Sequence, residues 1–234
     1  FTVFLTTLGL ISARAQVCYG NLNVKFGGAY CGMSDALDGA THHATEDIAV
    51  MRALPNMTVL VPSDATSTRW ATKYAVDTYG PMYLRLSRDV YPDLYDENTK
   101  FECGKGAIVR DGTDVTVIAC GILVHKALEA AEQMAARGVS VRVVDMYSIK
   151  PIDRELILRC AQETGAIVTA EEHNVIGGLG EAVCSLLSEK LPTPVRRVGV
   201  QDKFGCSGPA WDLLKEYGLD AATICKTAKE MLGK

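Results

Sequence analysis

Short apolar runs and longer stretches with apolar residues at helical spacing follow one another along the chain. The run Thr58–Val61 has the length of a buried strand and stops at Pro62. Ile48, Met51 and Leu54 recur at helical spacing, and that helix has to end before Pro55. For the first part of the chain we expect strands at 23–29, 58–61 and 82–86, and helices at 1–15, 45–54 and 64–79.

The composition turns polar between Asp89 and Asp114, and a second series of the same kind follows. Here we expect strands at 115–119, 139–145, 166–169 and 195–200, and helices at 125–137, 153–164, 180–191, 209–216 and 220–232. Strands that alternate with helices are typical of parallel sheets. The pattern predicts an α/β protein with two doubly wound sheet domains, residues 1–95 and 107–234, joined by a linker at 96–106.

Composition excludes several classes of protein. The chain has 234 residues, which suits two domains, and a formal net charge of −4 with no run of Lys or Arg, so no nucleic-acid partner is expected. The apolar stretch 1–15 is too short and too rich in threonine to span a membrane. It also lacks the methionine and basic start of a signal peptide, so we expect a buried helix in a fragment or tail of a longer product.

The eight cysteines are scattered through apolar or glycine-rich segments, and none forms a Cys-x-x-Cys pair. This spacing favours reduced, partly buried thiols over a disulfide framework or a zinc site. We therefore expect a cytoplasmic protein.

The densest group of chemically active side chains lies between Gly32 and Asp47, with three aspartates, one glutamate and the adjacent His42 and His43. Asp38-Gly39 predicts a turn, and Thr41 is a candidate N-cap for the helix that follows. Imidazole and carboxylate groups held at a helix start suit proton transfer. The alternative is a polar, capped helix entry with no chemical role.

This segment belongs to an ordered series of motifs. Asp38-Gly-Ala-Thr-His-His43 is preceded by Asn21-Leu-Asn-Val-Lys25 and followed by Gly80-Pro-Met-Tyr-Leu-Arg-Leu-Ser-Arg88. The series resembles the pyrimidine-binding domain of transketolases, which are thiamine diphosphate enzymes. Two later segments, 171–180 and 199–208, resemble the transketolase C-terminal domain. The resemblance covers essentially the whole chain but only the later part of a transketolase.

The resemblance implies specific roles. His42 matches the histidine that moves protons at the donor or acceptor hydroxyl, and Asp38 matches the aspartate that binds a donor hydroxyl. Arg88 matches the arginine that grips the sugar phosphate, a task suited to a planar guanidinium group. Phe1 and Phe4, one helical turn apart, match the aromatic residues beside the aminopyrimidine ring of the cofactor.

Three positions depart from the family pattern. Tyr30 stands where transketolases usually carry a histidine that helps to bind the substrate phosphate, and we keep it among the substrate-binding residues. Leu37 replaces an acidic residue, and Thr7 replaces an aromatic one. These departures concern substrate preference more than fold.

Other parts of a transketolase site are not found in this sequence. The glutamate that protonates the aminopyrimidine lies upstream of the matching segment, and no Gly-Asp-Gly motif with a downstream Asn is present. We therefore expect the ligands of Mg²⁺ or Ca²⁺ on a separate N-terminal diphosphate-binding domain or subunit, and none on this chain. The expected assembly is a homodimer or a heterotetramer acting on sugar phosphates, and the isolated chain is expected to be inactive.

Alternatives remain open. The pair His42-His43 also suits a deoxyxylulose-phosphate synthase, and Tyr30 and Leu37 would be tolerated in a non-catalytic partner subunit. The segment Gly177–Gly180 could be a dinucleotide loop, but Val183 replaces the third glycine of that motif, which favours a tight packing turn. Glu171–His173 could be a site, although the corresponding region of transketolases faces a subunit contact.

Overall fold

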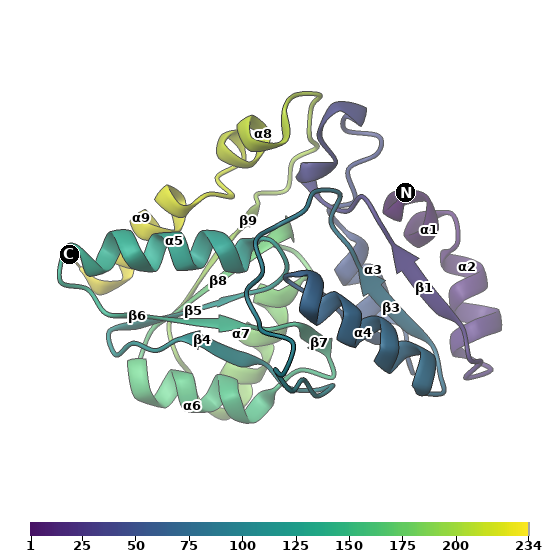
Figure 1. Ribbon diagram of the computed structural model, residues 1–234, viewed down its shortest axis with the longest axis horizontal. Coiled ribbons are helices and arrows are strands. Elements are labelled where there is room, and N and C mark those ends of the chain that lie inside the picture. The colour runs from purple at the N-terminus through teal and green to yellow at the C-terminus, as the bar shows by residue number, and fades with distance from the viewer. Residues whose placement is uncertain (234) are drawn as a thin grey trace.

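In the computed structural model, which describes residues 1–233, two sheets stand side by side (Figure 1). The first sheet has the strand order β1-β3-β2-β7. Its strands are β1 (Lys25–Gly28), β2 (Thr58–Leu60), β3 (Met82–Arg85) and β7 (Ser148–Lys150). The first three are parallel and β7 is antiparallel to β2, so the carboxyl ends of β1, β2 and β3 meet at one edge.

Several helical segments pack against this first sheet. They are α1 (Thr2–Thr7), α2 (Leu10–Ser12), the π-helix η1 (Ala13–Cys18), α3 (Asp47–Ala53) and α4 (Ala65–Asp77). The 3₁₀ helix η2 (Met33–Asp38) instead packs against the second half of the chain. Helix α4 begins at a capping box. The Asp64 carboxylate accepts from the Ser67 N–H at 2.7 Å, and the Ser67 hydroxyl accepts from the Asp64 N–H.

The second sheet has the order β4-β6-β5-β8-β9, with only β4 antiparallel. Helices α5 and α9 cover one face, and α6 and α7 cover the other (Figure 1). The elements are β4 (Ala107–Arg110), β5 (Val115–Ala119), α5 (Leu123–Ala135), β6 (Val141–Asp145), α6 (Arg154–Thr164), β8 (Ile167–Asn174), α7 (Leu179–Lys190), β9 (Val195–Val200), α8 (Ala210–Glu216) and α9 (Ala221–Leu232). Helices on both faces of a mainly parallel sheet confirm the predicted α/β class.

The core lies between these layers. Every residue of β5 and of β6 is buried, so both strands are rich in valine, and their polar residues Thr116, Arg142 and Asp145 have hydrogen-bond partners. Such strands show no alternation of apolar and polar residues, and their length and flanking turns are what made them recognisable in the sequence.

The two halves share backbone hydrogen bonds. Strand β7 leaves the second half to pair with β2, and the Val61 N–H donates to the Tyr147 carbonyl at 2.8 Å. The Asn174 N–H donates to the Thr45 carbonyl at 2.7 Å. The first sheet therefore includes residues from beyond 96–106, and the linker at 96–106 stays a prediction.

The expected helix at 1–15 forms, but the expectation that it is buried is wrong. Leu8 is 81% exposed and Ile11 is 80% exposed, whereas the buried positions are small or polar residues such as Thr2, Thr6 and Ala13. Phe1, Phe4, Leu8 and Ile11 of this segment are exposed, whereas Leu5 and Leu10 are partly buried against the core. Within residues 1–233, no helix combines the length and the apolar character needed to cross a membrane.

Candidate active site

The six residues expected to form a site come from four segments that end at one edge of the first sheet. Phe1 and Phe4 lie at the start of α1, Tyr30 follows β1, and Arg88 follows β3. Asp38 ends the 3₁₀ helix η2, and His42 lies in the turn after it. Strands β1 and β3 are parallel neighbours, so their carboxyl ends bring these residues into one region.

One part of this region is aromatic. The His42 ring lies edge-on to Phe1 and Phe4, with ring centroids 4.9 and 5.1 Å away. Phe1 also contacts Tyr30, with a centroid distance of 5.1 Å. Phe1 and Phe4 are 48% and 42% exposed, so their rings form an open apolar wall beside an imidazole. Such a wall can stack a flat heteroaromatic ring.

The other part is charged. Nη1 of Arg88 donates to Asp38 Oδ2 at 2.7 Å and to Asp35 Oδ1 at 3.2 Å, and its guanidinium group lies over the Tyr30 ring, 5.0 Å from the centroid. Burial, followed by the charge of Asp38, raises the pKa of Asp35, and Arg88 opposes this shift. The Arg88 contacts with Asp35 and Asp38 use only Nη1, so Nη2 and Nε have no partner among the described residues.

Asp35 is a site residue that the sequence analysis missed. It is fully buried beneath Arg88 and binds it with both a side-chain and a backbone oxygen. Spacing alone could not indicate this role, because η2 is kinked at Ala36, between Asp35 and Asp38, where φ is +68°.

The two histidines differ in surroundings. Thr41 Oγ1 lies 3.0 Å from Nδ1 of His42, and Nε2 of His42 has no hydrogen bond within residues 1–233. His43 is 4% exposed, and its Nε2 lies 3.1 Å from the Ala36 carbonyl, so that nitrogen carries the proton and donates. A Cβ atom on Gly205 would overlap the His43 ring, so the loop from the second half closes directly over it.

The expected N-cap role of Thr41 is wrong. Helix α3 begins at Asp47, with Glu46 as its N-cap residue and no side-chain cap. The N–H groups of His42 and His43 both donate to the Gly39 carbonyl, at 2.9 and 3.2 Å. A separate turn therefore occupies residues 39–43, and the Thr41 hydroxyl positions His42 instead.

A buried ion pair supports this edge from below. Arg85, the last residue of β3, binds Asp47 through Nε at 2.7 Å and Nη2 at 3.2 Å, and the Tyr83 hydroxyl donates to Asp47 at 2.6 Å. Burial would raise the pKa of Asp47, but Arg85 and these hydrogen bonds lower it below its usual value. Arg85 also donates to the Glu172 carbonyl at 2.8 Å, which ties β3 to the second half.

Glu171 and His173 do not face a subunit contact, since both are fully buried within this chain. The Glu171 carboxylate accepts from the N–H groups of Leu179 and Gly180 at 2.7 and 2.8 Å. It therefore occupies the helix start where a dinucleotide diphosphate would bind, and the Gly177–Gly180 segment is a packing turn.

The residues present fit one half of a thiamine diphosphate site. The aromatic wall suits the pyrimidine ring, but no group of three His, Cys, Asp or Glu side chains able to hold a metal occurs in the described part of the chain.

Comparisons with known proteins agree with this geometry. Residues 1–93 match the family model of the transketolase pyrimidine-binding domain, and residues 104–224 match that of the transketolase C-terminal domain. A 6-deoxy-6-sulfo-D-fructose transketolase subunit of Clostridium sp. is 42% identical over 231 residues, covering 99% of this chain and 72% of the relative. An apulose-4-phosphate transketolase subunit of Phocaeicola vulgatus is 41% identical over 232 residues, covering 99% and 74%.

A solved structure described as a split gene transketolase, inactive beta4 tetramer, superposes with a TM-score of 0.94 at 48% identity. The match covers all of this chain and 75% of that one. Each of these relatives is matched over most of its own length. The chain therefore belongs to the transketolase family and corresponds to the C-terminal part of a transketolase, with its pyrimidine-binding and C-terminal domains.

Proposed function

We propose that this chain supplies the pyrimidine-binding half of the active site in a transketolase that moves a two-carbon ketol unit from a ketose phosphate to an aldose phosphate. The observation that carries this proposal is the meeting of Phe1, Phe4, His42, Asp38 and Arg88 at one sheet edge. Transketolases depend on thiamine diphosphate, which supplies the nucleophilic carbon of the reaction when bound.

The aromatic wall orients the cofactor in this proposal. Phe1 and Phe4 present half-exposed rings that would stack on the aminopyrimidine and exclude water from that side. The metal, Mg²⁺ or Ca²⁺, would be held with the diphosphate by a partner domain or subunit.

His42 moves the proton. The Thr41 hydroxyl holds Nδ1, which leaves Nε2 free to take a proton from a sugar hydroxyl and return it. Asp38 is 36% exposed in its side chain and lies on the same side as His42, where it can accept a hydrogen bond from a second hydroxyl of the sugar.

Arg88 binds the phosphate. Its Nη1 is held by Asp35 and Asp38, so Nε and Nη2 remain as a pair of donors for phosphate oxygens. Tyr30 supports the flat face of the guanidinium group. We propose that Tyr30, at the position where a histidine usually contacts the phosphate, acts here by orienting Arg88.

Assembly completes the site. Phe1, Phe4, Leu8 and Ile11 form an exposed apolar stripe along the first helical segment, with exposures of 48, 42, 81 and 80%. Exposed apolar surface of this kind marks a contact. We propose that an N-terminal diphosphate-binding domain or chain covers it, in a dimer or a larger assembly. The eight unpaired cysteines suit a cytoplasmic location, which is likewise proposed.

A deoxyxylulose-phosphate synthase activity and a non-catalytic role are less favoured. The relatives matched over most of their length are named as transketolase subunits, and the proposed catalytic and phosphate-binding residues are all present. No single observation favours either alternative.

The phosphate role of Arg88 is tested in an assembly reconstituted with an N-terminal transketolase chain. A charged hydrogen bond contributes about 1.5–3 kcal/mol, and Arg88→Ala removes two of them, so KM for a phosphorylated sugar should rise by at least about 100-fold. KM for the unphosphorylated sugar should stay unchanged. Arg196→Ala, at an exposed position on β9, is the matched control. Equal effects on both sugars would refute the phosphate assignment.

A further inference from the structure

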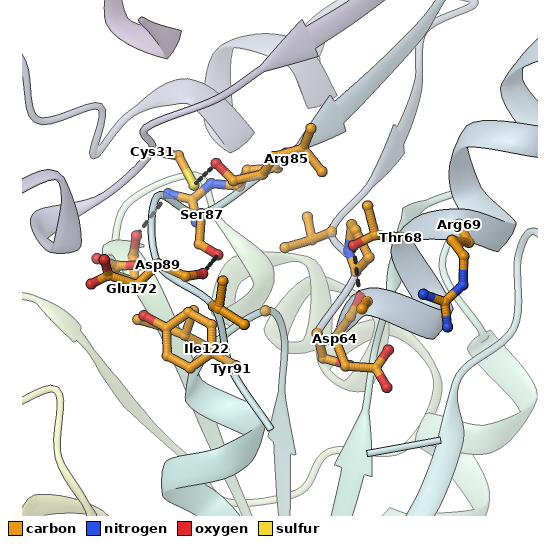
Figure 2. Close-up of a pocket in the computed structure, with 17 residues that line it drawn as sticks. Cys31, Asp64, Thr68, Arg69, Arg85, Ser87, Asp89, Tyr91, Ile122 and Glu172 are labelled. Atoms are coloured by element: carbon orange, nitrogen blue, oxygen red, sulfur yellow. Dashed lines mark hydrogen bonds between the residues drawn. The ribbon is translucent and has the colours of Figure 1, made fainter. Parts of the chain in front are cut away.

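A cleft of about 440 Å³ lies beside the segment 86–91, and Figure 2 shows Ser87, Asp89 and Tyr91 of this segment at its wall. Leu86, Ser87, Asp89, Val90 and Tyr91 line it. Arg88 does not, because its side chain turns to the other side and binds Asp35 and Asp38. None of the six expected site residues lines this cleft.

The cleft occupies a favoured place in the fold. In the second sheet, β6 lies on one side of β5 and β8 on the other, so the chain reverses its winding direction at β5. Gly121 and Ile122, just after β5, and Glu172, near the end of β8, line the cleft. The segments that follow β2 and β3 form the opposite wall, so carboxyl ends from both sheets converge here. Ligands of open α/β sheets bind at such a reversal point.

One end of the cleft holds polar atoms without partners. Glu172 is 2% exposed, and one of its carboxylate oxygens accepts from the Ser34 N–H, but Oε2 has no hydrogen-bond partner among the described residues. The hydroxyls of Tyr91 and of the neighbouring Ser34 are likewise buried and have no partner within hydrogen-bond distance in the described part of the chain. A buried polar group without a partner costs free energy, so this end is complementary to a ligand that can supply hydrogen bonds.

The other buried polar side chains that line the cleft already have hydrogen-bond or ion-pair partners. The Ser63 hydroxyl donates to Asp145 at 2.5 Å, and the guanidinium group of Arg85 is paired with Asp47. Asp64 accepts from the N–H groups of Ser67, Leu94 and Tyr95. Two cationic side chains line the cleft among the described residues. Arg85 lies in its buried part and is paired with Asp47, whereas Arg69 lies exposed at its edge. The cleft therefore does not suit a phosphate or a carboxylate.

The walls of the cleft include the apolar residues Val61, Pro62, Leu86, Val90 and Ile122. A volume of this size is typical of sites for small organic molecules. We propose that the cleft is a second binding site, which takes a small uncharged molecule with a flat apolar body and an amide or hydroxyl head, the head lying on Glu172 and Tyr91. This inference does not depend on the proposed transketolase activity.

The test uses the full chain and two probes of nearly equal shape, benzamide and benzoate, titrated by ligand-observed NMR. Benzamide should bind saturably with a Kd of about 1 mM, as its size allows. Benzoate should bind at least about 5-fold more weakly, because its charge finds no free cation in the buried part of the cleft. Tyr91→Phe, which removes only the hydroxyl, should weaken benzamide binding by about 2- to 10-fold.

A matched pair of surface variants locates the binding. Val90→Trp, at a residue that is 96% exposed and lines the cleft, should block the mouth and abolish saturable benzamide binding. Val76→Trp, at a residue on α4 that is 73% exposed and does not line the cleft, should bind as the parent chain does. Benzamide that fails to saturate, binds no better than benzoate, or binds Val90→Trp unchanged would overturn the proposal.

Discussion

His42 and His43 have different surroundings, and these surroundings determine what each imidazole can do. They are adjacent in the sequence, yet His42 faces the exposed rings of Phe1 and Phe4, whereas His43 lies under the loop at Gly205. The first can exchange a proton with a bound molecule, and the second is part of the packing between the two halves.

The two histidines should therefore respond differently to replacement by alanine. In a reconstituted enzyme, His42→Ala should lower kcat by about 100- to 10,000-fold, as expected for a lost acid–base group, without changing stability. His43→Ala should lower the free energy of unfolding by about 1–3 kcal/mol and leave kcat per folded molecule nearly unchanged. Steady-state kinetics and urea unfolding measure the two effects. Equal losses of kcat would show that His42 is not the proton carrier.

Asp145 gives a prediction about pH. It is fully buried at the end of β6, where the Ser63 and Tyr95 hydroxyls donate to it at 2.5 and 2.8 Å. Burial raises the pKa of Asp145 to about 7, although the two hydroxyl groups oppose the shift. Asp145 is therefore protonated more readily in the folded state than in the unfolded state. The free energy of unfolding falls as pH rises from near 4 toward 7, because the buried carboxyl then loses its proton.

Asp145→Asn should remove this pH dependence. Relative to the parent chain, the variant should gain stability between pH 4 and pH 8, by up to about 4 kcal/mol at about 1.4 kcal/mol per pKa unit. Urea unfolding across this range measures the difference. Asp77→Asn, at an exposed residue of α4, should show no such trend, and a flat difference for Asp145→Asn would contradict the assignment.

The grouping of the candidate site residues could be predicted from the sequence where family motifs contain them, and their roles stay predictions. Phe1, Phe4, Asp38, His42 and Arg88 lie in segments that resemble transketolase motifs, and the structure brings them together. Asp35 was not predictable in this way, because its role depends on the path of η2 beneath Arg88. The prediction that Thr41 caps the following helix was wrong because the N–H groups of His42 and His43 donate to the Gly39 carbonyl.

At the scale of elements, hydrophobic pattern and turn residues were enough for the longer helices and the central strands. The short strands β4 and β7 were missed, since three or four residues carry little periodicity and β7 pairs with a strand from the other half. The burial of the first helix was predicted wrongly. Apolar residues indicate that a helix face is covered in the assembled protein, but they do not show whether the covering surface belongs to the same chain.

That exposed face predicts an effect on assembly. Leu8→Asp with Ile11→Asp should leave the chain folded, because both side chains are about four-fifths exposed, but should weaken self-association or partner binding by at least about 100-fold. Light scattering at micromolar concentration measures this. Val76→Asp, on the exposed side of α4, should assemble normally. A parent chain that already behaves as a 25.2 kDa monomer with its partner present would contradict the role of this stripe.

At the scale of the whole molecule, the two halves are joined by hydrogen bonds beside the proposed pyrimidine-binding region. Arg85 pairs with the buried Asp47 and also donates to the Glu172 carbonyl of the second half. The aromatic wall and Arg88 are in place, but no metal-binding group is found among residues 1–233. In the proposed assembly, the partner N-terminal subunit supplies the rest of the cofactor site.

Calorimetric titration of thiamine diphosphate with Mg²⁺ tests this account most directly. It is done once with the chain alone and once with the chain mixed with an N-terminal diphosphate-binding transketolase chain. The account predicts weak or undetectable binding to the chain alone, and binding at least about 100-fold tighter, together with ketol transfer, in the mixture. Tight, metal-dependent binding of the cofactor to the isolated chain would contradict it.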